Sequence, residues 1–214
     1  RPTVIFDLDG VLVDSEAAVA GCMNHALAAM GRAPRPEAEL YGYIGAPIAH
    51  AFGELLGVAP EDPQVTEMIA AYRTRYATVS LTATTVEPGI PEALEALAAT
   101  HRLAVATSKP TPFAEPLLEA MGLSDFFEVV AGPPFDERAE PKTVTLGAAL
   151  ARLGPTRAVM VGDRSYDVVA AHAHALPAIG VTWGIGSREE LRAAERLIDA
   201  PAELPAAVAD LLEE

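Results

Sequence analysis

The sequence predicts an α/β protein, a doubly wound parallel-sheet core with an all-helical domain inserted into it. From about residue 85 onward, short apolar runs alternate with helical stretches. Such alternation is typical of parallel strands that are covered by helices on both faces. The segment VIFDL near the N-terminus has the character of these later runs. Between the two parts, the chain has a helical pattern almost throughout.

The expected core strands are short runs of apolar residues. After VIFDL, which begins at Val4, four runs read as buried strands: LAVAT (103–107), FEVVAG (127–132), AVMVGD (158–163) and PAIGVTW (177–183). Helices are expected beside them over residues 90–99, 112–121, 142–153 and 165–175. The sheet domain therefore begins at the N-terminus, pauses for an insertion and resumes near residue 85.

The inserted segment carries the periodicity of helices. Apolar residues recur there at spacings of three and four, at Val19, Met23, Leu27 and Met30. Further helices are expected over 46–57 and 61–77. We place the core domain at residues 1–14 and 85–214 and the inserted helical domain at 15–84. The two crossings between them are the expected hinges.

Charge and composition restrict the function. The 214 residues include 15 Lys and Arg against 30 Asp and Glu, a net charge of −15, which argues against nucleic acid or an anionic membrane as partner. Cys22 lies in an apolar helical pattern and reads as a core residue. No apolar run reaches the roughly 18 residues that span a bilayer, and no signal-peptide pattern is present. We expect a cytoplasmic monomer or homodimer.

Several polar residues follow the expected strands. Ligands of doubly wound sheets bind beyond the carboxyl ends of the strands, so residues at those ends are candidates for one shared pocket. Four groups fall there: Asp7 with Asp9, Thr107 with Ser108, Lys142, and Asp163 with Asp167.

The first pair of carboxylates is difficult to explain as a solvated turn. Leu8 continues the buried run, while Asp7 and Asp9 point the other way. Two carboxylates this close repel each other unless a cation or different protonation states relieve the repulsion. A magnesium ion with hard oxygen ligands would meet the first condition. A division of labour between a nucleophile and a general acid would meet the second.

The second pair lies at the opening of a helix. Asp163 and Asp167 are four residues apart, which places them on one face. Taken alone, Asp167 reads as a helix cap or a partner of the helix dipole. Together with the first pair, Asp163 becomes a candidate metal ligand.

The remaining groups suit an anion. Thr107 and Ser108 offer a hydroxyl and a backbone N–H at a strand-to-helix turn, as a phosphate oxygen requires. Lys142 begins a helix whose own N-terminus is positive, an awkward place for a cation unless an anion lies between them. Lys109 is a second candidate cation, ranked lower because a lysine just after a strand is more often solvated.

The ordered motifs resemble those of one family. DLDGV, TSK, a lysine that begins a helix, and GDRSYD are similar to the motifs of the haloacid dehalogenase superfamily of aspartate-nucleophile phosphohydrolases. Within it the chain resembles the phosphoglycolate-phosphatase-like branch, which has a helical cap after the first motif. The resemblance extends to YIGAP at 43–47 and WGIGSREEL at 183–191.

This resemblance implies roles for the four aspartates. Asp7 would attack phosphorus and become a phosphoaspartate. Asp9 would protonate the leaving oxygen and later deprotonate the hydrolytic water. Mg²⁺ would be held by the Asp7 carboxylate, the backbone carbonyl of Asp9 and Asp163, with Asp167 bound to it or close by.

The resemblance also implies a substrate site. Thr107 and Ser108 would bind the phosphoryl oxygens, and Lys142 would neutralise charge on nucleophile and phosphate, with Thr107 and Lys142 counted as catalytic. Tyr43 and Gly45 belong to a cap loop that faces the active site in this branch. The implied substrate is a small phosphorylated metabolite: phosphoglycolate, a nucleotide, a sugar phosphate, pyrophosphate or a biosynthetic intermediate.

Two alternatives stay open at the level of sequence. Val11 replaces the threonine of many phosphatases in this family and is common in β-phosphoglucomutase-like sugar-phosphate mutases, although TSKP and WGIGSREEL favour a phosphatase. A receiver-like phospho-acceptor or a non-catalytic binding module belongs to a different class. Receivers are much shorter and carry no helical insertion.

Overall fold

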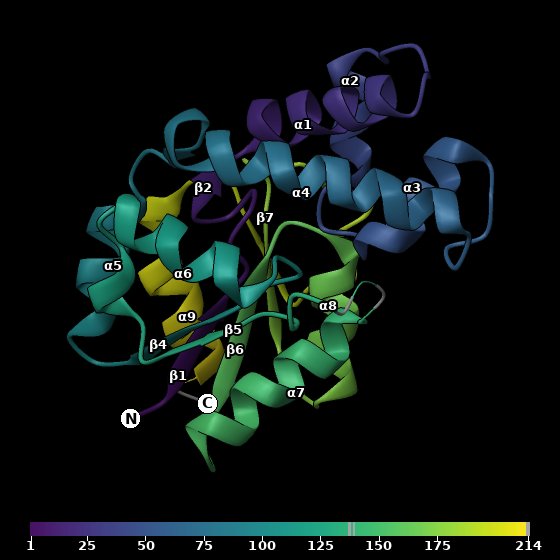
Figure 1. Cartoon of the computed structure of the whole chain (residues 1–214). Helices are drawn as coiled ribbons and strands as arrows, with labels where there is room; N and C mark the ends of the chain where they lie inside the picture. Colours follow the sequence, from purple (N-terminus) through teal and green to yellow (C-terminus); the bar gives the residue numbers. More distant parts are fainter. Residues whose placement is uncertain (137, 139, 213–214) are drawn as a thin grey trace.

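A six-stranded parallel sheet forms the centre of the molecule in the computed structural model, which describes residues 1–136, 138 and 140–212 (Figure 1). The strand order is β5-β4-β1-β6-β7-β8, and neighbouring strands run parallel. The strands are β1 (Thr3–Phe6), β4 (Arg102–Ala106), β5 (Val129–Ala131), β6 (Ala158–Gly162), β7 (Ala178–Val181) and β8 (Arg196–Ile198). The predicted α/β fold class is confirmed.

Helices cover both faces of this sheet. Along β1, Val4 and Phe6 pack into one hydrophobic cluster and Ile5 into another, as the two-residue period of a strand requires. The first cluster includes side chains of α5 (Ile90–Ala98), α6 (Thr111–Ala120) and α9 (Leu204–Leu212). The second includes side chains of α7 (Lys142–Leu153) and α8 (Ser165–Ala173). Burial on both faces explains why the core strands are apolar without alternation.

The inserted segment is helical and has a hydrophobic cluster of its own. It comprises α1 (Glu16–Ala29), α2 (Glu37–Leu40), the 3₁₀ turn η1 (Tyr41–Tyr43), α3 (Ile48–Leu56) and α4 (Pro63–Ala83). Asp62 caps α4 by accepting the backbone N–H of Gln64 at 2.8 Å, and Pro63 occupies the first turn. Cys22 is buried in this cluster, as predicted. We refer to these helices as the cap; its boundaries at 15 and 84 stay a prediction.

Two strands join the cap to the core where no strand was expected. β2 (Val13–Asp14) and β3 (Thr85–Val86) pair antiparallel at the two crossings. Two residues carry too little pattern to predict a strand, but the crossings lie side by side, so their backbone groups pair. β8 and α9 were also not predicted.

The register of the sheet places the motif residues in one row. Phe6 pairs with Val105 of β4 and with Val161 of β6. The residues that follow these strands, Asp7, Thr107 and Asp163, therefore emerge at the same carboxyl edge of the sheet.

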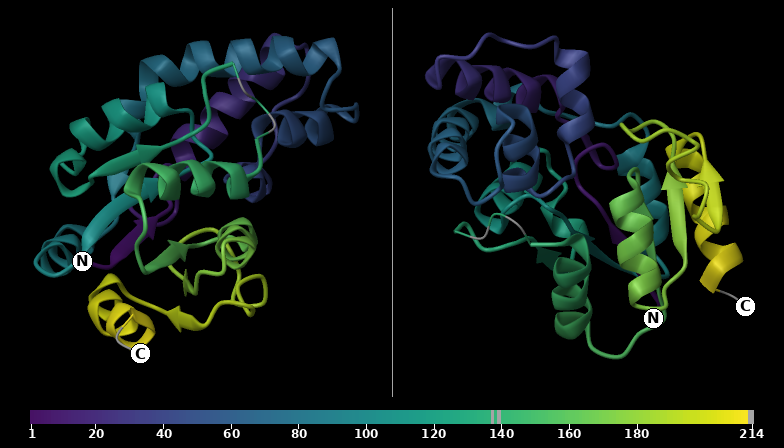
Figure 2. Two further views of the ribbon diagram at one scale, coloured as in Figure 1. Left: turned by 90° about the horizontal axis from the view of Figure 1, so that it is seen from below. Right: turned by 90° about the vertical axis from the view of Figure 1, so that its right-hand side faces the viewer.

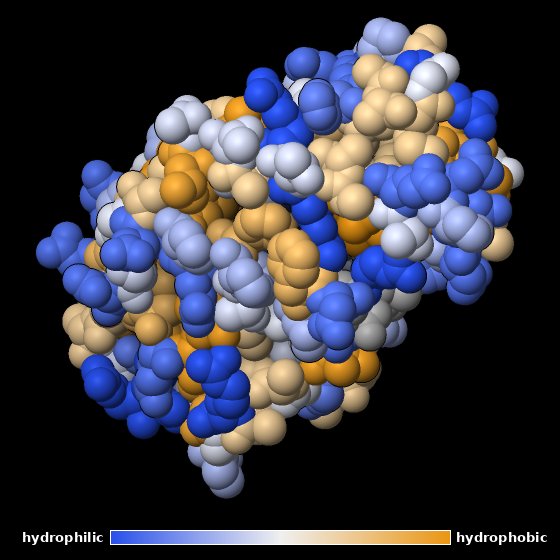
Figure 3. Space-filling model, viewed as in Figure 1, coloured by the Kyte–Doolittle hydropathy of each residue, from blue (hydrophilic) through white to orange (hydrophobic). Residues whose placement is uncertain are grey.

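The cap covers this edge, and the N-terminus and the end of α9 lie on the core away from the cap (Figures 1 and 2). Hydrophobic residues show between hydrophilic ones across the region where cap and core meet (Figure 3). In the described part of the chain, a helix both long and apolar enough for a transmembrane span is not found.

Candidate active site

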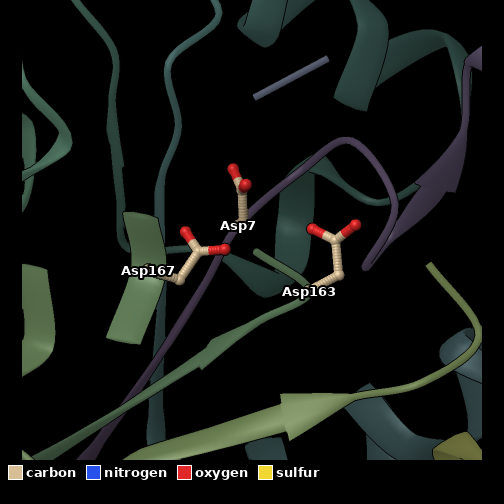
Figure 4. A group of neighbouring side chains, drawn as sticks. All are labelled: Asp7, Asp163 and Asp167. Atoms are coloured by element: carbon tan, nitrogen blue, oxygen red, sulfur yellow. The ribbon is translucent and has the colours of Figure 1, made fainter. Parts of the chain in front are cut away.

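Three buried carboxylates meet at the carboxyl edge of the sheet. Asp7 follows β1, Asp163 follows β6, and Asp167 lies in the first turn of α8 (Figure 4). One oxygen of each can be chosen so that all three lie within 4.8 Å of one another. Their exposed fractions are 3%, 0% and 1%, so water screens their mutual repulsion poorly.

Glycines allow the surrounding loops to approach Asp163 closely. Gly10 has a φ of +79°, and a Cβ there would lie 2.4 Å from Asp163 Oδ2. A Cβ on Gly184 would lie 2.5 Å from the same oxygen. The backbone N–H of Ile185 donates to Oδ2 at 2.8 Å. The DLDG motif therefore needs its glycine for space as well as for conformation.

Lys142 supplies the positive charge of the cluster. Its Nζ lies 2.7 Å from Asp7 Oδ1 and 2.9 Å from Asp167 Oδ1, and its side chain is 4% exposed. Lys142 begins α7, where an anion was expected to offset its charge. Two carboxylates of the protein, Asp7 and Asp167, meet part of that expectation.

Burial shifts the ionisation of these groups. It raises the pKa of Asp7 to about 6, with Lys142 opposing the shift and Asp167 adding to it. Burial and the neighbouring Asp167 and Asp7 raise the pKa of Asp163 well above its ordinary value. Burial alone lowers the pKa of Lys142, but Asp167 and Asp7 outweigh it and raise that pKa.

The cluster has the chemistry of a divalent-cation site. Oδ1 of Asp163 is buried and accepts no hydrogen bond from the described residues. When all three carboxylates are ionised, the single lysine leaves negative charge in excess, and carboxylate oxygens are the ligands that hard cations prefer. A divalent metal ion fits both the orphaned oxygen and the excess charge.

Asp167 also has the structural role that its position suggested. Its Oδ2 accepts the backbone N–H of Arg164 at 3.0 Å, which satisfies a free donor at the start of α8. Its Oδ1 faces Lys142. Asp167 therefore stabilises the N-terminus of α8 and also belongs to the charged cluster.

Asp9 is separate from the three-carboxylate cluster and is held by two donors. Its Oδ1 accepts the Ser15 hydroxyl at 2.5 Å and lies 3.1 Å from Lys109 Nζ. Lys109 is buried, with 6% of its side chain exposed, so the expectation that it is solvated was wrong. Its ammonium group contacts both Asp9 and the hydroxyl of Tyr76, a residue of the cap, which a pattern within its own strand and helix could not indicate.

One cavity of about 90 Å³ collects the remaining predicted residues. Its walls come from core and cap together and include Asp7, Asp9, Thr107, Ser108, Tyr43 and Gly45. Lys142, Asp163 and Asp167 adjoin it through Asp7. The structure therefore brings together every site residue named from the sequence.

Arg164 is a contact between core and cap that the sequence analysis missed. It donates to the carbonyl oxygens of Ile44 and, at 3.2 Å, Gly42 in the cap, and its Nε lies 2.9 Å from Glu190 Oε1. A Cβ on Gly45 would lie 3.2 Å from Arg164 Cγ. Its place between Asp163 and Asp167 was the only signal available.

Comparison with known proteins identifies the class. The chain belongs to the haloacid dehalogenase-like hydrolases, whose family model matches residues 4–181. The resemblance found in the motifs is thereby confirmed.

Individual relatives are similar along most of this chain. A phosphoglycolate phosphatase of Agrobacterium fabrum is 38% identical over 86% of this chain and 81% of its own length. The tyrosine-protein kinase PtkA of Mycobacterium tuberculosis is 41% identical over 86% of this chain, which spans only 62% of that protein. A crystal structure described as a predicted phosphatase from Clostridium acetobutylicum superposes with a TM-score of 0.92 at 32% identity, covering 98% of this chain and 99% of that one.

Proposed function

We propose that this protein is a magnesium-dependent phosphomonoester hydrolase that acts on a small phosphorylated metabolite through a phosphoaspartate at Asp7. The observation that carries the proposal is the position of the Asp7 carboxylate, which contacts Lys142 and lines the cavity between cap and core. The membership in a hydrolase family and the named phosphatases among similar proteins support it.

In the first step, a carboxylate oxygen of Asp7 attacks phosphorus. The Asp7–phosphorus bond forms while the bond from phosphorus to the leaving oxygen breaks. Asp9, which lines the same cavity, gives its proton to the leaving oxygen, so the product departs as an alcohol.

In the second step, a water molecule attacks the phosphorus of the phosphoaspartate. Asp9, now a carboxylate, takes a proton from this water. The Asp7–phosphorus bond breaks, inorganic phosphate is released, and both aspartates return to their starting states.

Charge neutralisation is the second requirement of phosphoryl transfer. Asp7, Asp163 and the backbone carbonyl of Asp9 would hold the metal ion, with Asp167 bound or close by. When bound, Mg²⁺ supplies positive charge to the phosphoryl oxygens. Lys142 stabilises the charge on Asp7, and Thr107 and Ser108 bind the phosphoryl oxygens from the end of β4.

The cap supplies residues that would contact the substrate. Tyr43 and Gly45 line the cavity beside the catalytic aspartates, and closure of the cap would exclude water during the first step. The leaving group would lie between these cap residues and the catalytic aspartates. Phosphoglycolate is the first candidate, because phosphoglycolate phosphatases are among the similar proteins.

The test is phosphate release from a panel of phosphoglycolate, sugar phosphates and nucleoside monophosphates, with Mg²⁺ or EDTA, by wild type and Asp7→Asn. We expect release that requires Mg²⁺ and is lost in the variant. Undiminished release by Asp7→Asn would contradict the mechanism.

The same samples separate the alternatives. Conversion of one sugar phosphate to its isomer without phosphate release would indicate a mutase. A long-lived acyl phosphate without turnover would indicate a receiver-like module.

A further inference from the structure

Lys109 connects the general acid to the cap. Its Nζ lies 3.1 Å from Asp9 Oδ1 in the core, and it donates a hydrogen bond to the hydroxyl of Tyr76 in α4. The same ammonium lies 4.5 Å from the centre of the Tyr76 ring. These three groups all line the cavity of the candidate active site.

Aromatic packing fixes the position of the Tyr76 hydroxyl. Tyr76 is 1% exposed and stacks on Tyr72 of the same helix, with ring centres 5.5 Å apart. Phe113 of α6 meets it edge-to-face at 5.2 Å. Tyr76 therefore has one neighbour in the cap and one in the core, and its hydroxyl reaches Lys109 because the cap lies against the core.

The contacts of Asp9 are one-sided. Both donors, Ser15 and Lys109, contact Oδ1, whereas Oδ2 accepts no hydrogen bond within the described residues. With Oδ1 occupied, a proton on Asp9 lies on Oδ2, and the two donors determine where that oxygen points. A shift of Lys109 would therefore change the direction of Oδ2 within the cavity.

We propose that Lys109 and Tyr76 are positioning residues that orient the general acid Asp9 and make this orientation depend on the placement of the cap. The proposal rests on the proposed function, because it assigns no role to these residues unless Asp9 transfers a proton. A buried ammonium needs partners to replace its hydration, so Lys109 stays between the Tyr76 hydroxyl and the Asp9 carboxylate.

The leaving group distinguishes this role from simple support of the fold. An alkyl ester must have its leaving oxygen protonated, whereas p-nitrophenolate departs without a proton. Misplacing Asp9 therefore slows the first step for an alkyl ester more than for p-nitrophenyl phosphate. A general loss of cap packing would slow both esters alike.

The experiment compares kcat/KM for p-nitrophenyl phosphate and for the best alkyl ester of the panel. For Tyr76→Phe, which keeps the ring, we expect kcat/KM for the alkyl ester to fall about tenfold further than that for the aryl ester. Lys109→Met should lower the ratio of kcat/KM for the alkyl ester to kcat/KM for the aryl ester in the same way and by a larger factor. Tyr72→Phe removes a neighbouring hydroxyl that accepts no hydrogen bond from Lys109 in the described part of the chain, and we expect its ratio of the two kcat/KM values to equal that of wild type.

Each other outcome is informative. Equal losses on both esters for Tyr76→Phe would overturn the positioning role while leaving the proposed function intact. The same change of ratio in Tyr72→Phe would also overturn it. If Lys109→Met fails to fold, the ratio of the two kcat/KM values in Tyr76→Phe alone decides whether the positioning role holds. Wild type that hydrolyses neither ester would overturn the proposed function itself.

Discussion

Asp167 combines two requirements in one carboxylate. Its Oδ2 caps α8 through the Arg164 backbone, and its Oδ1 faces Lys142 within the charged cluster. An asparagine keeps an oxygen that can accept the Arg164 N–H but removes the negative charge, whereas an alanine removes both. The two substitutions therefore separate the structural contribution of this residue from its electrostatic one.

We expect the free energy of unfolding of Asp167→Ala to be about 1 kcal/mol lower than that of Asp167→Asn, because only alanine lacks an oxygen that can accept the backbone N–H of Arg164. Both variants should lose phosphatase activity, since both lack the charge. Urea denaturation in EDTA measures the first effect and phosphate release the second. Equal stability of the two variants would show that the hydrogen bond to the Arg164 backbone contributes little to the stability of the protein.

Asp9 offers a second test at the scale of single residues. Asp9→Asn cannot take a proton from the hydrolytic water, but p-nitrophenolate leaves without receiving one. We expect rapid release of nitrophenolate up to the concentration of enzyme, followed by slow turnover, in a stopped-flow absorbance trace. Steady release at the wild-type rate, with no such burst, would exclude Asp9 as the base.

Among the elements, the loop between β1 and β2 has no room for a side chain at Gly10. Gly10 has a positive φ, and a side chain there would meet Asp163. Gly31, at the end of α1, has a φ of +68° with open space around its Cβ position. The two glycines thus share a backbone requirement and differ in their surroundings.

We expect backbone strain to cost each of Gly10→Ala and Gly31→Ala about 1 kcal/mol of stability. For Gly10→Ala the contact of the new methyl group with Asp163 adds to this strain, so its total loss of stability should be larger and most activity should be lost as well. Thermal denaturation and phosphate release measure both effects. Full activity in Gly10→Ala would show that the position of Asp163 is not critical.

At the scale of the whole molecule, charge links metal binding to pH. The raised pKa of Asp7, about 6, means that the metal-free folded protein holds a proton more tightly than the unfolded chain does. Its contribution to stability is therefore fully present below about pH 4 and is lost as pH rises through about 6. A bound cation reverses this dependence, because it requires the carboxylate form.

We expect the increase in Tm caused by Mg²⁺, relative to EDTA, to be larger at pH 7.5 than at pH 5. Asp163→Asn, which lacks one proposed ligand, serves as the control and should show a smaller increase at either pH. Differential scanning fluorimetry provides the measurement. An increase that is independent of pH and of Asp163 would argue against this cluster as the metal site.

The sequence predicted the parts of the molecule that local patterns encode. Apolar runs located five of the six core strands, and motif residues at their ends identified the charged cluster. β8 was missed because its residues, RLI, begin with the exposed Arg196 and form no apolar run, and the β2–β3 pair exists only because two distant crossings meet. The burial of Lys109 and the cap contacts of Arg164 likewise depend on how the cap lies on the core.

Chemical trapping tests most directly whether Asp7 carries the phosphoryl group during turnover. Borohydride added during turnover reduces an acyl phosphate to an alcohol, which would convert Asp7 to homoserine. Mass spectrometry of the peptide that contains VIFDLDG should then find homoserine at position 7, only when both substrate and Mg²⁺ are present. An unmodified Asp7 under turnover, or homoserine at position 9 instead, would exclude Asp7 as the residue that carries the phosphoryl group.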